Sequence, residues 1–399
     1  MVILSAMYSS HNTDNVKLSL FSKAAILIIA ALFPYMQAFP QTEYSNWLLG
    51  NGSIASFVPS FNLQNDYNED MYLWPFAISD NNGRIILHGY LESDEKSEKR
   101  FVIKNVNNEI VVSEGNNIRF VKNIVYCKTN GGQYYVAVVL CKISGSIENL
   151  HIYRFDAQGV LKKTDIFDSA VYKSFLAMVP CGEDVELLAY NNSNHSIETF
   201  KLTESVVVKD RSFNTTLGKF MSLAPFPFKI RQTIDGSLIF ARVHTDLFEV
   251  SFNHENGDIA VKKSENCLFL NMAISPNEKY LLTFEDNKLI GYELDPHVGV
   301  DLSKRHVLYE FSLQSMDYCW AMQTGIDGNI YLLVSKLNHI YNIIIIKDVE
   351  GQSISPQIID TNPITTIHQS YNIFPQIMRR LHQNGNPCSA PAAPRIIPE

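Results

Sequence analysis

Side chains that could do chemistry are plentiful in this chain, but they do not fall into a catalytic motif. The 11 histidines are scattered, and no pair has the spacing of metal ligands. There is no GxSxG elbow, no HExxH, no P-loop, and no GxGxxG after an expected strand. We therefore predict no catalytic residue, no cofactor and no bound metal ion, and we favour a protein that is not an enzyme.

Four aspartates are each followed by a glycine within three residues, namely Asp80, Asp156, Asp235 and Asp327. Aspartate side chains hydrogen-bond the nearby backbone and tolerate tight turns. A calcium site needs several oxygens that converge on one ion, and none of these segments alternates acids as an EF-hand loop does. A role in turns is the simpler interpretation, and calcium binding is the less favoured one.

Three aromatic residues are the candidates for facing a ligand: Tyr72, Trp74 and Trp320. Such rings could line a site for a glycan or a peptide, although packing in the core or at a sheet edge is their more ordinary role. Paired carboxylates of a lyase or hydrolase could also come together from distant parts of the chain, which a sequence cannot show.

The elements that would position these residues are short strands. Ala273–Leu294 contains two apolar runs around the turn Ser275–Lys279, and a second turn at Glu285–Lys288 leads into a third run. The same plan of strand, polar turn and strand recurs along the chain. No window of eleven or more residues after the N-terminal segment has a helical apolar period, so the sequence predicts an all-β protein.

The turns recur at regular intervals of 42 to 53 residues, marked by Asp80, Gly131, Gly182, Asp235, Asn277 and Asp327. Repeats of about 40–50 residues with four strands each are typical of β-propeller blades. We predict a single seven-bladed β-propeller over residues 43–382, whose last blade is closed by strands from both termini, Asn46–Phe61 and Ile364–Pro375. Two β-sandwich domains are the alternative, but they would not give one period over most of the chain.

The N-terminal segment is typical of a signal peptide. Lys17 and Lys23 precede the apolar run Ala24–Phe33, and Pro34 and the small residue Ala38 follow it. The run is shorter than the roughly 20 residues that a spanning helix needs, so an uncleaved anchor is the less favoured alternative. We predict that residues 1–41 direct export to the periplasm, the cell surface or the medium, with no membrane insertion after cleavage. Residues 383–399, rich in Pro and Ala, are expected to form a tail or linker.

Composition and net charge restrict the classes of partner that this protein could bind. A hydrophobic share of 46% with 19% charged residues is typical of a folded protein, and the net charge of −8 opposes binding to nucleic acid. The six cysteines show no CxxC spacing, so we expect buried free thiols rather than disulfides or a zinc site. If Gly131 and Gly132 form a two-residue turn, Cys127 lies opposite Val136 and is not paired with Cys141.

Several segments, in order, are similar to those of a known family: Asn46–Phe57, Ser79–Ile86, Gln133–Val138, Ile230–Ala241, Ala273–Leu282, Ala321–Leu332 and Tyr371–Leu381. Over about residues 46–381 the chain resembles the exported WD40-like β-propellers of Bacteroidota, often labelled gliding-motility-associated. Several turns have lost the glycine of that family's pattern, as at Asn277-Glu278. The resemblance implies an exported propeller and carries over no catalytic residue.

These observations favour a non-catalytic propeller that binds an envelope protein or a surface glycan. A carbohydrate-active propeller enzyme, a polysaccharide lyase or hydrolase, is the alternative, and a degenerate structural propeller is a third hypothesis. The side chains at the mouths of the propeller's central channel would distinguish the binding protein from the enzyme. Three or more acidic, His, Arg or Tyr side chains at one mouth would favour the enzyme, whereas hydroxyl, amide and aliphatic groups would favour the binding protein.

Overall fold

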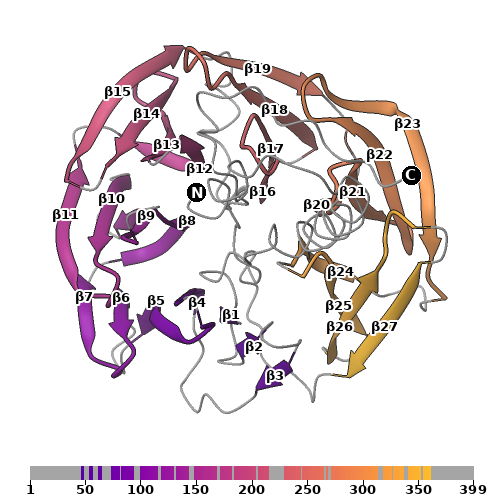
Figure 1. Ribbon diagram of the computed structural model, residues 1–399, viewed down its shortest axis with the longest axis horizontal. Helices are drawn as coiled ribbons and strands as arrows, with labels where there is room; N and C mark the ends of the chain where they lie inside the picture. Colours follow the sequence, from indigo (N-terminus) through magenta and orange to yellow (C-terminus); the bar gives the residue numbers. More distant parts are fainter. Residues whose placement is uncertain are drawn as a thin grey trace, which may run out of the picture. The chain divides into compact units, whose positions relative to one another are not determined.

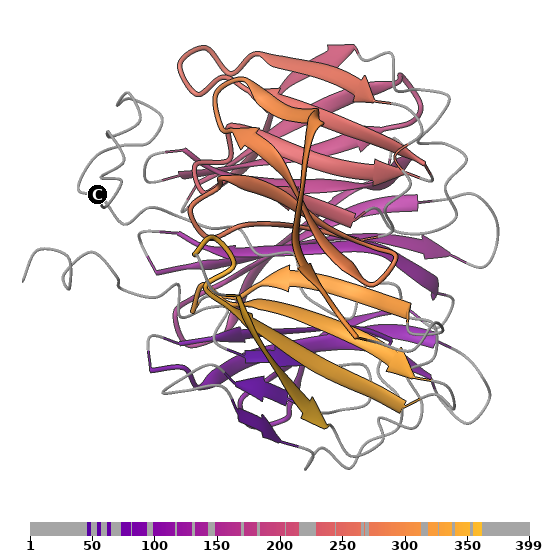
Figure 2. The ribbon, with the colours of Figure 1, turned by 90° about the vertical axis from the view of Figure 1, so that its right-hand side faces the viewer.

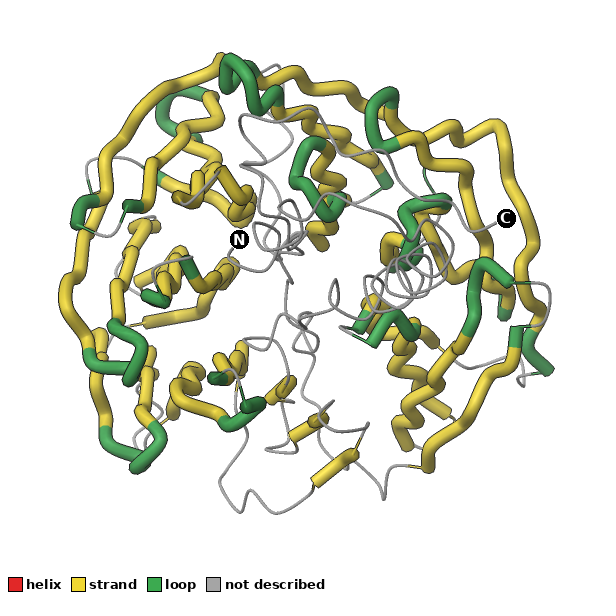
Figure 3. The backbone as a smooth tube through the Cα atoms, in the orientation of Figure 1, coloured by secondary structure: helices red, strands yellow, loops and turns green. Residues whose placement is uncertain are grey.

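The computed structural model describes residues 46–48, 54–56, 62–64, 73–80, 82–93, 99–115, 118–129, 132–142, 148–168, 171–181, 184–203, 205–214, 229–243, 245–264, 267, 271–312, 318–325, 327–336, 340–351 and 354–360. In this part of the chain all regular elements are strands, and Figure 3 shows only strands and loops there. The prediction of an all-β protein is therefore confirmed. No helix long and apolar enough to cross a membrane occurs among these residues.

The strands form antiparallel sheets, each of which we name by its first strand. The first three four-stranded sheets are β4 (Leu73–Ser79), β5 (Ile85–Ser93), β6 (Lys99–Asn105) and β7 (Ile110–Glu114); β8 (Ile118–Lys128), β9 (Tyr134–Lys142), β10 (Glu148–Phe155) and β11 (Leu161–Phe167); and β12 (Tyr172–Cys181), β13 (Asp184–Asn191), β14 (Ser196–Leu202) and β15 (Val207–Asn214).

Three more four-stranded sheets follow in the chain: β16 (Lys229–Gln232), β17 (Leu238–Val243), β18 (Asp246–Phe252) and β19 (Ile259–Ser264); β20 (Met272–Ile274), β21 (Tyr280–Glu285), β22 (Lys288–Asp295) and β23 (Gly299–Glu310); and β24 (Tyr318–Thr324), β25 (Ile330–Lys336), β26 (Ile340–Lys347) and β27 (Ser355–Asp360). A three-stranded sheet, β1 (Asn46–Leu48), β2 (Ile54–Ser56) and β3 (Asn62–Gln64), precedes them. In every sheet, consecutive strands of the chain pair with one another.

All six marker positions of the sequence period fall between the first and second strands of the six four-stranded sheets. The turn after β4 shows why its residues suit it. The Asp80 side chain accepts hydrogen bonds from the backbone N–H groups of Asn82 (2.8 Å) and Arg84 (2.9 Å), and Gly83 adopts a φ of 75°. Asp156 bonds Gln158 and Val160 in the same way. The expected turn role of these aspartates is confirmed.

Strand burial follows from the way the sheets stack face to face. The first eight residues of β9 are all buried, and so are seven of the eight residues of β13, because neighbouring sheets cover both faces of these strands. The outermost strand β15 is largely exposed. The sequence of these strands accounts for their burial. The middle strands β9 and β13 are nearly continuous apolar runs, whereas the outer strand β15 is largely polar.

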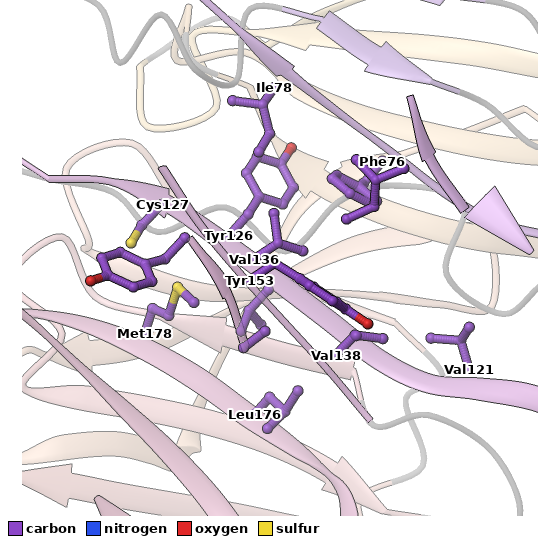
Figure 4. Packing of buried hydrophobic residues seen from close by; sticks show 14 of the residues in the cluster. Phe76, Ile78, Val121, Tyr126, Cys127, Val136, Val138, Tyr153, Leu176 and Met178 are labelled. Carbon is purple, nitrogen blue, oxygen red and sulfur yellow. The ribbon is translucent and has the colours of Figure 1, made fainter. Parts of the chain in front are cut away.

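Apolar side chains fill the space between neighbouring sheets, as Figure 4 shows for one such region. Phe76 of the β4 sheet packs on Tyr126 of the β8 sheet, with ring centroids 5.6 Å apart. Leu176 and Met178 of the β12 sheet belong to the same buried cluster. Other clusters join the β12 and β16 sheets, the β16 and β20 sheets, and the β20 and β24 sheets. Each sheet is thus held by its neighbours.

Residues 41–399 form one compact unit, in which the sheets follow one another around a common centre. Figure 1 shows that the first strand of each four-stranded sheet lies innermost and the fourth lies outermost. Contacts join β4 to β8, β8 to β12, β12 to β16, β16 to β20, and β20 to β24. The described residues therefore have the all-β architecture of stacked four-stranded blades that the repeat period predicts.

The β1 sheet lies beside the sheets at both ends of this series. Strand β1 contacts β4, and the buried ring of Trp47 meets Tyr331 of β25 at a centroid distance of 5.4 Å and an angle of 76°. The stretch Asn46–Phe61 thus supplies strands, as expected. The partner segment Ile364–Pro375, the signal segment 1–41 and the tail 383–399 lie outside the described residues, and these predictions stay open.

The cysteine prediction is confirmed where it can be followed, although the register behind it is wrong. Cys127, Cys141, Cys267 and Cys319 are buried free thiols. The β8–β9 pairing places Cys127 opposite Tyr135 rather than Val136. The reason is that Lys128 pairs with Tyr134, so the connection has five residues instead of two, and an odd loop shifts every facing pair by one.

Candidate functional site

The innermost strands of the four-stranded sheets all begin at the same end of the unit, which we call the starting face. In a four-stranded antiparallel sheet, the fourth strand ends where the first begins. Three residues separate the end of β7 at Glu114 from the start of β8 at Ile118, so the next first strand starts at the same end. Figure 2 shows the strands running back and forth between two faces of the unit.

Two of the three predicted ligand-facing aromatics lie near this face, at irregular positions of innermost strands. In β4 the pairing with β5 passes from Leu73 to Phe76 and skips Trp74 and Pro75. In β24 the pairing with β25 passes from Cys319 to Ala321 and skips Trp320. Residues at such bulges leave the regular ladder, and bulges are common beside binding sites. The third candidate, Tyr72, lies outside the described residues.

Cationic residues occupy bulges of the next innermost strand, β8, and sequence reasoning missed them. The register skips Arg119 between Ile118 and Phe120, and Lys122 between Val121 and Asn123. The Arg119 side chain is exposed, whereas Lys122 is buried. A signal was present, because both charges interrupt a largely apolar run, but the register that skips them depends on the sheet. The starting face thus combines aromatic and cationic residues on innermost strands.

The most unusual polar group of the innermost strands is the Arg231 guanidinium. Its Nε donates to the Met272 carbonyl of β20 (3.0 Å), Nη1 to the Ile230 carbonyl (2.7 Å), and Nη2 to the Met322 carbonyl of β24 (2.6 Å). One side chain of β16 therefore reaches the two following sheets. Burial lowers the pKa of Arg231 to about 10, which leaves it protonated at neutral pH.

Other side chains cap carbonyl groups of the innermost strands in the same manner. These strands have a sheet neighbour on one side only, so part of their backbone needs other partners. Gln232 Nε2 donates to the Met178 carbonyl of β12 at 2.8 Å. The Asn271 amide donates to the Cys319 carbonyl, and the Thr324 hydroxyl donates to the Ile274 carbonyl. Amide and hydroxyl groups thus accompany Arg231 on these strands.

A buried carboxylate, Glu198, stands near the starting face in the β12 sheet. It accepts hydrogen bonds from the Tyr172 hydroxyl (2.7 Å), the Asn191 amide (2.8 Å) and Lys209 Nζ (2.6 Å). Burial opposes the ionised form, but these hydrogen bonds outweigh it and hold the pKa of Glu198 below its usual value. Since the bonds join strands β12, β13, β14 and β15, the group binds one sheet together.

A second polar group joins the β4 and β8 sheets. The Tyr153 hydroxyl of β10 donates to Glu114 of β7 at 2.9 Å and lies 3.2 Å from His151 Nδ1. Burial and the neighbouring carboxylate raise the pKa of Tyr153, which keeps the phenol protonated. Burial opposes ionisation of Glu114, but the contacts with His151 and Tyr153 hold its pKa below the usual value. Chemically, this group is a carboxylate held by two donors across a sheet interface.

Metal binding finds no support in the described residues, where no cluster of three or more His, Cys, Asp or Glu side chains is suited to hold an ion. Asp327 illustrates how the turn carboxylates are used instead. Its Oδ2 accepts from the Tyr331 hydroxyl (2.6 Å) and from the Asn329 amide (2.7 Å).

The sheet series identifies the architecture. It is that of a β-propeller. No family model matches the chain, and no curated protein matches it. Accordingly, the resemblance to the Bacteroidota propellers, stated from sequence segments, remains a prediction.

Solved structures with a similar arrangement are distant in sequence. A Bacteroides fragilis protein provisionally named a 6-phosphogluconolactonase is 13% identical, covers 81% of this chain and 98% of its own, and has a TM-score of 0.48. The lectin of the fungus Aleuria aurantia, a six-bladed β-propeller that recognises fucose, is 13% identical, covers 70% and 92%, and has a TM-score of 0.40. We draw neither ligand nor activity from these likenesses.

Proposed function

We propose that this protein is an exported, non-catalytic binding module with the form of a closed seven-bladed β-propeller, which holds a protein or a glycan at the cell envelope. Support for closure comes from Trp47, whose ring packs on Tyr331 and so links the β1 sheet to the β24 sheet. In this proposal the β1 sheet is the seventh blade, and Ile364–Pro375 adds a strand to it. A rigid ring presents its loops as one broad surface.

The observation that carries the binding function is the kind of polar group on the innermost strands. Among the described residues, those that cap carbonyl groups on or beside these strands are the amides Gln232, Asn271 and Gln323, the hydroxyl of Thr324 and the guanidinium of Arg231. Such groups orient a hydroxylated or amide-containing ligand by hydrogen bonds. General acid–base chemistry instead requires a pair of titratable groups with matched pKa values.

The starting face supports the same function from its aromatic and cationic residues. Trp74 and Trp320 sit at bulges of β4 and β24, and the exposed residue Arg119 sits at a bulge of β8. Aromatic rings and arginine are enriched where proteins bind partners, because they offer a large contact area together with polar edges. We infer that this face contacts the partner.

The proposal includes a cellular location, the cell envelope. The basic and apolar N-terminal segment and the resemblance to exported Bacteroidota propellers favour an envelope protein or a surface glycan as partner. In this setting the chain acts outside the cytoplasm, with no nucleic-acid partner and no inserted segment after cleavage. The gliding-motility label of that family also refers to a process at the cell envelope.

The test is affinity capture with the full exported chain, carrying a C-terminal tag, from envelope extracts of its own cells and on a panel of surface glycans. We expect one partner to be retained specifically, and the variants W74A and W320A to weaken its binding by about tenfold or more, as loss of an anchoring aromatic does. Val298→Ser serves as a control, because Val298 is exposed at 78% on a turn at the opposite end.

Two results would overturn the proposal. One is retention that W74A and W320A leave unchanged while both variants remain folded by circular dichroism. The other is catalysis, seen as release of new reducing ends or unsaturated products from any glycan of the panel by the wild-type chain.

A further inference from the structure

Basic side chains gather on the outermost strands of four consecutive sheets. Strands β11, β15, β19 and β23 together contain eight Lys and Arg residues, two on each strand, and four Asp and Glu residues, although the chain as a whole has more acidic than basic residues. The outermost strands of the other two four-stranded sheets, β7 and β27, contain one carboxylate each and no Lys or Arg. We call the eight Lys and Arg residues of the four strands the rim cations.

Each rim cation is the more exposed member of an ion pair. Lys262 is exposed at 61% and its partner Glu249 at 9%, and Lys209 is half-exposed whereas its partner Glu198 is fully buried. The same order holds for the other six cations and their carboxylates. Six of the eight carboxylates are exposed at less than a quarter. The surface of these strands therefore presents mainly the positive member of each pair.

The ion pairs leave the rim cations able to contact a further anion. A lysine ammonium has three N–H donors and an arginine guanidinium has five, so a cation that contacts one carboxylate has donors left. Exposed ion pairs also contribute little to stability, because water screens both charges. The pair of Lys262 shows this, since Glu249 accepts the Val300 N–H at 3.0 Å as well and keeps that bond if the lysine turns to another anion.

The arrangement of the four strands indicates the shape of the partner. They follow one another along the outer edge of the unit, as Figure 1 shows, so the rim cations form a long band on a convex edge. A small molecule could contact only one strand of this band. A broad anionic surface such as a membrane would also meet the rest of the chain, whose net charge is −8 in total. A thin, elongated anion fits the band best.

We propose that the rim cations bind an acidic polysaccharide, a flexible chain whose anionic groups run along β11, β15, β19 and β23. Double-stranded DNA is also an elongated polyanion, but it is stiff over about 150 base pairs and bends around a protein only at a cost in energy. The choice of a polysaccharide rests on the envelope location proposed above. The band itself includes neither Trp74, Trp320 nor Arg119, so contact at the starting face and contact at the rim can fail separately.

Binding of labelled polygalacturonate to the full chain, followed by fluorescence anisotropy, tests the proposal. Neutral dextran and a DNA duplex are the other probes. We expect saturable binding of polygalacturonate that weakens as salt is added, no binding of dextran, and weaker binding of the duplex. The variants W74A and W320A should leave the binding of polygalacturonate unchanged, which separates the rim from the starting face.

A triple variant, Lys162→Gln with Lys262→Gln and Lys304→Gln, removes one rim cation from each of three strands. It should bind polygalacturonate about tenfold or more weakly, because each lost charge removes a contact with the polyanion. The variant should fold, since the three carboxylates that lose a lysine keep another donor: the Val160 N–H for Asp156, the Val300 N–H for Glu249 and the His306 ring for Glu293.

A second triple variant controls for the net charge. Arg84→Gln with Lys279→Gln and Lys347→Gln removes the same number of charges at exposed residues that are not rim cations. It should bind polygalacturonate nearly as the wild type does.

Three results would overturn the proposal. The first is a wild-type chain that binds polygalacturonate no better than dextran, which decides the matter whether or not the variants fold. The second is equal weakening by the two triple variants, because net charge alone would then account for the binding. The third is tighter binding of the duplex than of polygalacturonate, which would make a nucleic acid the partner of the rim cations.

Discussion

The ring of Trp47 meets the ring of Tyr331 edge-on, with centroids 5.4 Å apart, although 283 residues lie between the two in the chain. Trp47 belongs to a three-residue strand and is only 1% exposed. A strand so short gains little from its own hydrogen bonds. Its place therefore depends on this aromatic contact, which also links the beginning of the described chain to the β24 sheet.

Trp47→Ala should destabilise the protein by about 3–5 kcal/mol, the usual cost of truncating a buried tryptophan. Urea unfolding followed by circular dichroism measures the change. Tyr331→Phe is the control, because it keeps the ring contact and loses only the hydrogen bond to Asp327, which costs about 1 kcal/mol. A Trp47→Ala protein as stable as the wild type would contradict a linking role for this contact.

Gly89 leaves room for an aromatic ring, and its replacement should be harmful. A Cβ atom built at Gly89 would lie 2.3 Å from Phe76 Cε1 and 2.9 Å from the Val102 carbonyl oxygen. Gly89→Ala should therefore cost about 1–3 kcal/mol through overpacking. Gly115→Ala is the matched control, since nothing lies within 4 Å of a Cβ there, and it should stay within about 0.5 kcal/mol of the wild type. Equal midpoints in urea for both variants would refute the packing argument.

The turn aspartates should stabilise the chain without calcium. Asp80→Ala removes the two hydrogen bonds to the Asn82 and Arg84 N–H groups and should cost about 1–2 kcal/mol. Asp80→Asn keeps a side-chain oxygen that can accept the same bonds and should cost less. Thermal unfolding with calcium and with EDTA should give the same midpoint for the wild type. A calcium-dependent rise that Asp80→Ala abolishes would instead indicate an ion site.

How far the sequence predicts this fold is clearest at the turns. Turns such as Asp80–Arg84 are local, because an Asp and a Gly with positive φ supply nearly all that the chain reversal needs. The turn positions therefore predict the sheets. The facing register of Cys127 was predicted wrongly, since it depends on the five-residue connection between Lys128 and Tyr134. The bulges at Arg119 and Lys122, farther along β8, were not predicted either, because they depend on the packing of whole sheets.

The candidate sites were less predictable than the fold. Arg231 bonds the Met322 carbonyl 91 residues later in the chain, and no local pattern indicates such a contact. One signal was available. At the equivalent position, two residues before the turn, other first strands carry Cys127, Ala273 or Gln323, so that an arginine there is exceptional. For Trp74 and Trp320, the residue type was noted from sequence, whereas their bulge positions required the sheet register.

Glu198 should make stability depend on pH in the acid range. Its folded-state pKa is held below the usual value, because hydrogen bonds from Lys209, Tyr172 and Asn191 outweigh the effect of burial. A group with a lowered folded pKa stabilises the protein fully above its unfolded pKa of about 4.3, and this contribution is lost as the pH falls through the folded pKa.

Glu198→Gln should accordingly lower the stability at pH 7 by about 1–3 kcal/mol, since a charge-assisted acceptor is replaced by a neutral one. Going from pH 6 to pH 3, the wild type should lose more stability than this variant, and the two curves should approach each other. Lys209→Met separates the contribution of the lysine charge from that of the Glu198 carboxylate. The lysine is 46% exposed, so solvent screens its charge and its loss should cost less than that of Glu198. Parallel curves for wild type and Glu198→Gln over this pH range, measured by urea unfolding, would show that the Glu198 carboxylate contributes no pH-dependent stability.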